Sequence, residues 1–206
     1  MSKARAKKIK LFLFDVDGVM TDGKIWIFPA PAGVTESSLE KGAAPGVSTQ
    51  SLIEAKGFHA HDGTGITLLQ RAGIKTGLIT KRRSETVGLR ARDLRVDYVY
   101  QGIQDKRGAF EEILEMEKLS TAEAVYVGDD VIDLPVMRVC GLAIAVKNAR
   151  PEVKEAAHYV TLHGGGEGGL RDAVEYVLKA QGRWKSVFEG YIAEKNPASG
   201  SKSQGQ

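Results

Sequence analysis

The chain has 206 residues, of which 42% are hydrophobic and 27% are charged, and its formal net charge is +3. This length and composition predict one globular domain with a single core. The small positive excess accompanies no basic stripe and no recognition motif, so the composition argues against nucleic-acid binding.

The first residues of the chain, 1–8, are rich in lysine and are predicted to form a solvated basic arm. The apolar run that follows is only about six residues long and ends in acidic residues, so it fails as part of a signal peptide. No segment approaches the roughly 18 apolar residues of a membrane span. Cys140 is the one cysteine, which excludes an internal disulfide and suits a reducing compartment. We therefore expect a cytoplasmic protein.

Beyond the arm, short apolar runs alternate with amphipathic helical patterns. The runs that are predicted to be buried strands cover residues 10–14, 75–80, 124–128 and 142–146. The helical patterns cover residues 65–73, 84–94, 106–119 and 134–139. This alternation predicts an α/β fold, a doubly wound parallel sheet with helices on both faces.

One insertion, at about residues 24–60, interrupts this alternation. It is predicted to be a small β-ribbon whose strands are joined by a flexible loop at 29–51, which is rich in Pro, Ala, Gly and Ser. We thus expect one domain at 9–184 that carries this insertion, followed by a flexible tail at 185–206.

Acidic residues follow two of the predicted strands. Asp15 and Asp17 come directly after the first strand. Asp129, Asp130 and Asp133 come after the strand at 124–128. Doubly wound sheets bind ligands beyond the carboxyl ends of their strands, where all these side chains would meet. Clustered carboxylates repel one another unless a hard cation neutralises them, and a set of oxygen ligands favours magnesium. Such a site points to phosphoryl chemistry.

Simpler explanations exist for each element of this pattern. A calcium-binding loop that starts at Asp15 would need glycine at its sixth position and preferably glutamate at its twelfth, but Met20 and Trp26 stand there. Two acidic residues in an isolated D-x-D pattern can simply cap a turn. Thr80, at the end of a strand, can be a capping residue too. Lys106 can be a solvated lysine. However, it lies at a predicted helix start, where a cation is unfavourable unless an anion such as phosphate is nearby.

Five motifs carry a family resemblance: DVDGVMTDG, the threonine after the next core strand, YQGIQDK, GDDVIDLPVMRVCGLAIAV and GGLRDAVEYVLKAQGRW. Together they resemble the haloacid-dehalogenase (HAD) superfamily of aspartyl-phosphate phosphatases. Within it, the chain resembles the 3-deoxy-D-manno-octulosonate 8-phosphate (KDO 8-phosphate) phosphatase family over roughly residues 9–184. The resemblance implies a HAD-like Rossmannoid fold without a large cap domain. It also implies a phosphomonoester hydrolase of lipopolysaccharide biosynthesis that uses Mg²⁺ and forms a homotetramer, in which neighbouring subunits close each site.

The resemblance also implies roles for the acidic residues. Asp15 would be the nucleophile that forms an aspartyl-phosphate. Asp17 would protonate the leaving sugar and then take a proton from water. One intervening residue suits this pair, because alternate side chains of an extended strand point the same way. The carboxylates of Asp15 and Asp129 and the backbone carbonyl of Asp17 would bind Mg²⁺.

Four further positions match the residues that surround these groups in the family. Thr80 and Lys106 would bind the phosphate and stabilise its developing charge. Asp130 and Asp133 would orient the metal ligands and waters.

The sugar is expected to contact a wider set of residues: Asp17, His59, Asp62, Gly63, Arg82, Arg90 and Lys106. The two arginines suit an acidic phosphorylated sugar. The sequence departs from the family pattern at several nearby positions: His59, His61, Thr67, Lys81 and Glu167.

Two alternatives to a KDO 8-phosphate phosphatase remain at this point. One is a phosphatase of a nine-carbon sugar acid such as KDN 9-phosphate. The other is not an enzyme: a receiver-like phospho-acceptor domain, which also combines a doubly wound sheet with an acidic metal site. In a receiver domain the acid pair precedes the acceptor aspartate along the chain, whereas here the expected acceptor comes first.

Overall fold

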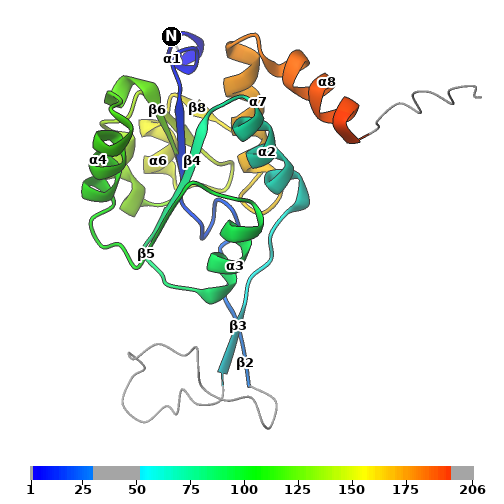
Figure 1. Cartoon of the computed structure of the whole chain (residues 1–206). Coiled ribbons are helices and arrows are strands. Elements are labelled where there is room, and N and C mark those ends of the chain that lie inside the picture. Colours follow the sequence, from blue (N-terminus) through cyan, green and yellow to red (C-terminus); the bar gives the residue numbers. More distant parts are fainter. Residues whose placement is uncertain (1, 30–51, 196–206) are drawn as a thin grey trace, which may run out of the picture.

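The computed structural model describes residues 2–29 and 52–195, in which a parallel sheet is covered by helices on both faces and a small ribbon extends from one end (Figure 1). Most of the predicted loop at 29–51 and the end of the predicted tail lie outside the described residues.

The main sheet has six strands, and all neighbouring strands run parallel. They are β1 (Leu11–Phe14), β4 (Lys75–Thr80), β5 (Tyr98–Gln101), β6 (Ala124–Gly128), β7 (Leu142–Ala145) and β8 (Tyr159–Val160). Their order is β5-β4-β1-β6-β7-β8, which is 3-2-1-4-5-6 when only these strands are counted. This is the Rossmann order, whereas receiver domains have the order 2-1-3-4-5. The receiver-like alternative therefore does not fit the fold.

The centre of the sheet forms where the sequence is most apolar. All four residues of β1 are buried, and this strand pairs with β4 on one side and β6 on the other. The four predicted strands agree with β1, β4, β6 and β7 to within one residue at each end. β5 and β8 were not predicted. They lie at the two edges of the sheet, where their residues are only partly buried and the sequence signal is weak.

Helices cover both faces of the sheet (Figure 1). They are α2 (Ala60–Arg71), α3 (Glu85–Asp93), α4 (Lys106–Glu117), α5 (Leu134–Met137), α6 (Pro151–Ala156) and α7 (Gly169–Ala180). Short 3₁₀ turns lie at Thr121–Glu123 and Val131–Asp133. α4 and α5 pack against each other on one face, and α2 and α7 pack against each other on the opposite one. As predicted, α4 buries Phe110, Ile113 and Leu114.

The two ends of the domain differ from the prediction. Residues 2–6 form helix α1 (Ser2–Ala6), which packs on α7 through the fully buried Ala6. Arg5 also donates a hydrogen bond to the Gly141 carbonyl oxygen at 2.8 Å. Part of the predicted basic arm is therefore helical and packed through Ala6, while Lys3, Ala4, Arg5, Lys7 and Lys8 are exposed. The predicted tail at 185–206 begins with most of a helix, α8 (Trp184–Lys195), which contacts α2 and α7.

The ribbon consists of β2 (Trp26–Pro29) and β3 (Leu52–Ala55), which pair antiparallel with Trp26 opposite Ala55. An antiparallel ribbon in this insertion agrees with the prediction. The rings of Trp26 and Phe28 stack at 6.5 Å on one side of it. Large apolar side chains stay exposed here: Ile25, Trp26, Ile27, Phe28 and Ile53.

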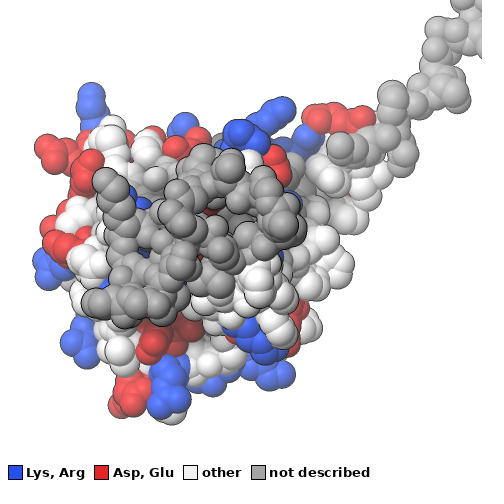
Figure 2. All heavy atoms as spheres, turned by 90° about the horizontal axis from the view of Figure 1, so that it is seen from below, with Lys and Arg blue, Asp and Glu red and all other residues white. Residues whose placement is uncertain are grey.

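The surface at the ribbon end carries charges of both signs. Figure 2 shows Lys and Arg interspersed with Asp and Glu over the part of this face that belongs to the described residues. Among the helices of residues 2–29 and 52–195, none is long and apolar enough to cross a bilayer.

Candidate active site

The carboxyl ends of β1, β4 and β6 meet at one edge of the sheet, because β1 lies between the other two strands and all three are parallel. Asp15 directly follows β1, Thr80 ends β4, and Asp129 directly follows β6. The Asp15 amide donates a hydrogen bond to the Val127 carbonyl oxygen at 3.0 Å, which extends the pairing of β1 with β6. The structure therefore brings these predicted residues to one place.

Asp15 is almost completely buried and has a partner on each carboxylate oxygen. Oδ1 accepts a hydrogen bond from the Val16 amide at 2.7 Å, and Oδ2 lies 2.6 Å from Lys106 Nζ. Burial and then the charge of Asp133 raise the pKa of Asp15 to about 7, although Lys106 opposes this shift. Because this pKa already includes the effect of Lys106, a further positive charge is needed to keep Asp15 fully ionised near neutral pH.

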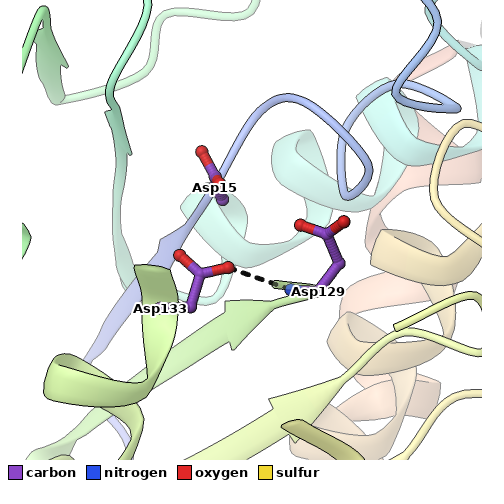
Figure 3. A group of neighbouring side chains, drawn as sticks. All are labelled: Asp15, Asp129 and Asp133. Atoms are coloured by element: carbon purple, nitrogen blue, oxygen red, sulfur yellow. Dashed lines mark hydrogen bonds between the residues drawn. The ribbon is translucent and has the colours of Figure 1, made fainter. Parts of the chain in front are cut away.

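Asp133 is fully buried, and both of its carboxylate oxygens accept hydrogen bonds. Oδ1 accepts from Lys106 Nζ at 2.8 Å and from the Tyr126 hydroxyl at 2.9 Å. Oδ2 accepts from the backbone amide of Asp129 at 3.0 Å (Figure 3) and from that of Asp130 at 3.3 Å. Asp133 thus links the start of α4, the middle of β6 and the turn after β6. Sequence reasoning missed Tyr126, although a tyrosine within a buried strand signals a hydrogen-bond partner in the core.

Asp130 shapes the turn rather than joining the acidic cluster. Its side chain is exposed, and Oδ1 accepts a hydrogen bond from the Val131 amide at 2.7 Å. It caps the 3₁₀ turn at Val131–Asp133, and Asp133, the last residue of this turn, accepts from the Asp130 amide in return.

Asp129 and Asp15 lie across the sheet edge from each other, and with Asp133 they form the acidic cluster drawn in Figure 3. One oxygen atom from each of the three lies within 4.8 Å of the other two. Burial, followed by the charges of Asp133 and Asp15, raises the pKa of Asp129 to about 8. Asp129 Oδ1 is buried, and none of the described residues donates a hydrogen bond to it. A buried carboxylate oxygen without a donor, within a cluster of acids, fits a hard cation such as Mg²⁺.

The loop after β1 passes close to Asp129, and only glycine allows this approach. Gly18 has a φ of +84°, and a Cβ there would lie 2.0 Å from Asp129 Oδ2. Asn148 fixes the same loop: its Nδ2 donates to the Gly18 carbonyl oxygen at 3.0 Å, and its Oδ1 accepts from the Gly165 amide at 2.6 Å. Sequence reasoning missed Asn148, although it follows a buried strand at the same edge of the sheet.

Lys106 is the first residue of α4 and is buried against the acidic cluster. Burial alone would lower its pKa, but the charges of Asp15 and Asp133 outweigh burial and raise it. These two carboxylates are the anions that a cation at a helix start requires. Thr80 is also buried, only 2% exposed, at the end of β4.

Asp17 lies at the rim of the cluster and contacts two cations. Lys56 Nζ forms an ion pair with Asp17 Oδ1, and Arg82 Nε lies 3.7 Å from Asp17 Oδ2. Arg82 was expected near the site, but sequence reasoning missed Lys56. The available signal was the spacing of Glu54 and Lys56, because residues two apart on an extended segment point to the same side.

The remaining predicted sugar contacts lie on or beside α2. Asp62 is buried, its Oδ1 accepts a hydrogen bond from the Arg171 amide at 2.8 Å, and burial raises its pKa. A Cβ at Gly63 would lie 2.5 Å from Arg90 Nη2, so Gly63 makes room for that guanidinium. His59 is the N-cap residue of α2. In this structure Asp62 therefore anchors the start of α7, and Gly63 positions Arg90.

The positions that depart from the family pattern have little interaction with the cluster. His61, Lys81 and Glu167 are exposed. The Thr67 hydroxyl donates a hydrogen bond to the Gly63 carbonyl oxygen at 3.3 Å, within α2.

Comparisons with known proteins agree with this geometry. Residues 70–171 match the family model of haloacid dehalogenase-like hydrolases. The chain is 37% identical over 177 residues to the 3-deoxy-D-manno-octulosonate 8-phosphate phosphatase of Yersinia pestis, which covers 86% of this chain and 83% of that protein. It is 35% identical over 180 residues to the phosphatase of the same name from Escherichia coli K12, covering 87% and 85% of the two chains.

A solved structure of similar fold contains ligands. It is the 3-deoxy-D-manno-octulosonate 8-phosphate phosphatase of Moraxella catarrhalis in complex with a magnesium ion, a phosphate ion and a KDO molecule. Its TM-score to this chain is 0.77 at 31% identity, and the match covers 92% of this chain and 97% of that one.

Proposed function

The chain belongs to the KDO 8-phosphate phosphatase family of haloacid dehalogenase-like hydrolases, and on this premise we propose that it hydrolyses KDO 8-phosphate to KDO and phosphate. The observation that carries this proposal is the acidic cluster beside Lys106, in which a buried oxygen of Asp129 lacks a donor among the described residues. Such a cluster is suited to binding a cation together with a phosphate group.

In the proposed reaction, Asp15 attacks the phosphorus atom and the sugar oxygen leaves, which forms an aspartyl-phosphate. Water then hydrolyses this intermediate and regenerates the carboxylate. The Val16 amide and Lys106 support the role of Asp15, because they fix its carboxylate and favour its ionised form.

Asp17 is proposed as the acid and base of the same reaction. It gives a proton to the leaving sugar oxygen in the first step and takes one from the attacking water in the second. Its position at the rim, with its side chain 23% exposed, suits a group that exchanges protons with substrate and water.

Mg²⁺ is the proposed cofactor, held by the carboxylates of Asp15 and Asp129 and the backbone carbonyl of Asp17. When bound, the ion neutralises the phosphate oxygens and aligns the group for attack. Asp133 is the orienting residue, because its two oxygens already accept four hydrogen bonds, and Asp130 supports the turn that carries it. Chelator should abolish phosphatase activity, and added Mg²⁺ should restore it; full activity in excess chelator would refute the metal site.

Thr80 and Lys106 are proposed to bind the phosphate group, and Arg82 and Arg90 the acidic sugar. Arg82 is 46% exposed, so it can reach a ligand without disrupting the core. His59 is proposed at the wall of the sugar site.

Asp62 and Gly63, which were expected to contact the sugar, are proposed to act indirectly. Asp62 holds the start of α7, and Gly63 leaves space for Arg90.

The main alternative is a phosphatase of nine-carbon sugar acids such as KDN 9-phosphate. The departures at His61, Thr67 and Glu167 count against KDO 8-phosphate, because they remove positive charge where a carboxylated sugar would bind. Measuring kcat/KM for KDO 8-phosphate and KDN 9-phosphate on one preparation separates the two. We expect KDO 8-phosphate to be preferred. A tenfold preference for KDN 9-phosphate would show that the substrate assignment is wrong, but it would leave the proposed phosphatase mechanism unchanged.

Assembly and location complete the proposal. The exposed apolar side chains of the ribbon support contact with further copies of the chain, in a homotetramer whose neighbours close each site. Light scattering at micromolar concentration should give a tetramer, and a monomer would refute this. The single cysteine supports a cytoplasmic location. The similarity to KDO 8-phosphate phosphatases supports a role in lipopolysaccharide biosynthesis.

A further inference from the structure

Each oxygen of the Asp17 carboxylate has a cation beside it, and the two cations differ in burial. Lys56 Nζ forms an ion pair with Oδ1, and the Lys56 side chain is 0% exposed. Arg82 Nε lies 3.7 Å from Oδ2, and the Arg82 side chain is 46% exposed. Lys56 is thus the interior contact of Asp17, and Arg82 is the contact that faces solvent.

Glu54 connects the same two cations to each other. Glu54 Oε1 lies 3.6 Å from Lys56 Nζ, and Oε2 accepts a hydrogen bond from Arg82 Nη2 at 2.8 Å. The four side chains form a closed ring of two acids and two bases with no net charge. Glu54 lies in β3 and Lys56 directly follows it, so the ring joins the ribbon to the loops after β1 and β4.

We propose that Lys56 is a positioning residue for Asp17. From its fixed place at the base of the ribbon, it holds the carboxylate in the orientation that delivers a proton to the leaving sugar oxygen. This inference rests on the proposed role of Asp17 as the acid of the reaction.

Two features separate this role from substrate binding. The Lys56 side chain is not exposed, and its Nζ lies between the carboxylates of Asp17 and Glu54, whereas the Arg82 side chain is open to solvent. Removing Lys56 would also leave the ring with a net negative charge beside the acidic cluster of Asp15, Asp129 and Asp133. Asp17 would then be repelled from the cluster and would turn towards Arg82 and solvent.

The test compares two leaving groups. The sugar alkoxide of KDO 8-phosphate needs a proton to leave, whereas the phenolate of p-nitrophenyl phosphate leaves with little help. kcat/KM reports on the steps up to departure of the leaving group, so it isolates the acid role of Asp17 from its later role as a base.

Lys56→Met should lower kcat/KM for KDO 8-phosphate by about 10–100-fold, within the range that general acid catalysis contributes, and that for p-nitrophenyl phosphate by less than about threefold. Lys56→Arg, which keeps the charge, should recover part of the loss. The matched control is Lys24→Met: Lys24 precedes the ribbon, is 69% exposed and pairs with Asp22 at 3.0 Å. It should change neither value.

The ratio of the two kcat/KM values does not depend on how much of a preparation is folded. If Lys56→Met does not fold, Glu54→Gln removes the second anchor of Lys56 and should give the same selective loss at smaller size. The inhibition constant of the product KDO should stay within about threefold of wild type, since Lys56 is not expected to touch the sugar.

Three results would overturn the inference. Equal losses on both substrates would mean that Lys56 supports only the fold. If the inhibition constant of KDO rises by as much as kcat/KM for KDO 8-phosphate falls, Lys56 is a substrate ligand. Asp17→Asn serves as the reference: if it is selective and Lys56→Met is not, only the role of Lys56 fails. If Asp17→Asn itself lacks selectivity, the proposed acid and the inference both fail.

Discussion

Replacing Lys106 with methionine tests how much one buried cation beside the acidic cluster contributes to the stability of the folded domain. Lys106 Nζ lies 2.6 Å from Asp15 and 2.8 Å from Asp133, and its side chain is 3% exposed. Methionine keeps much of the side-chain volume but removes the charge, so two buried carboxylates lose their shared counter-ion. Removing one partner of a buried ion pair costs about 3–5 kcal/mol of folding free energy. In a domain of about 200 residues this corresponds to a fall in Tm of roughly 6–20 °C.

The size of this fall should depend on pH. The pKa of Asp15 is raised to about 7 even with Lys106 present. A carboxyl group whose pKa is raised on folding destabilises the folded state as the pH rises from its unfolded value, about 3.9, through its folded value. At low pH the protonated carboxyl group of Asp15 needs no counter-ion. The Tm difference between wild type and Lys106→Met should therefore be smaller at pH 5 than at pH 8.

Thermal unfolding in chelator at pH 5, 7 and 8 measures this difference, and repeating it in excess Mg²⁺ completes the test. The cation should recover part of the lost Tm, because it binds the folded cluster and supplies the missing positive charge. Lys10→Met is the control, since it removes an exposed pair with Glu123 at 2.7 Å, and it should leave Tm close to that of wild type. A fall of less than about 2 °C at pH 8 for Lys106→Met would refute the reasoning.

Other variants address the nucleophile, the metal and the turn. Asp15→Asn should trap no phosphate on the protein in acid-quenched reactions, whereas Asp17→Asn should still form a phosphoenzyme from p-nitrophenyl phosphate; a labelled Asp15 variant would contradict the nucleophile assignment. Mg²⁺ affinity, measured by calorimetry, should rise from pH 6 to pH 8, because the cation must displace protons from groups with pKa values of about 7 (Asp15) and about 8 (Asp129). An affinity that is flat over this range would count against these ligands. Gly18→Ala should lose activity, since its φ is +84° and the added Cβ would lie 2.0 Å from Asp129 Oδ2. An active Gly18→Ala enzyme would show that this turn can move.

The centre of the fold and the acidic cluster could be predicted from the sequence because both depend on short-range patterns. Uninterrupted apolar runs such as Leu11–Phe14 occur where a strand is buried on both faces. Once the strands are parallel, residues that follow them must share one edge of the sheet, and this brings Asp15 and Asp129 together without knowledge of any contact.

The remaining features depend on contacts between distant parts of the chain. Lys56 meets Asp17 across 39 positions, and Asp62 meets the Arg171 amide across 109. A lysine or an aspartate with a distant partner has the same local sequence as one that is solvated. The same is true of α1. Its five residues have the sequence of a basic arm, and their helix is stabilised by packing on α7, which lies far along the chain.

The central place of β1 has a consequence for how the domain opens. Amide protons of β1, and that of Asp15 on Val127, should exchange with solvent only when the whole domain unfolds, because β4 and β6 cover both edges of the strand. The ribbon has two short strands and exposed faces, so its amides should exchange through local opening. The carboxylate of Asp15 therefore follows the strand whose amides should exchange most slowly. The ion pair between Lys56 and Asp17 instead depends on the ribbon, whose amides should be among the fastest to exchange. Mild denaturant should release Asp17 well before Asp15 moves.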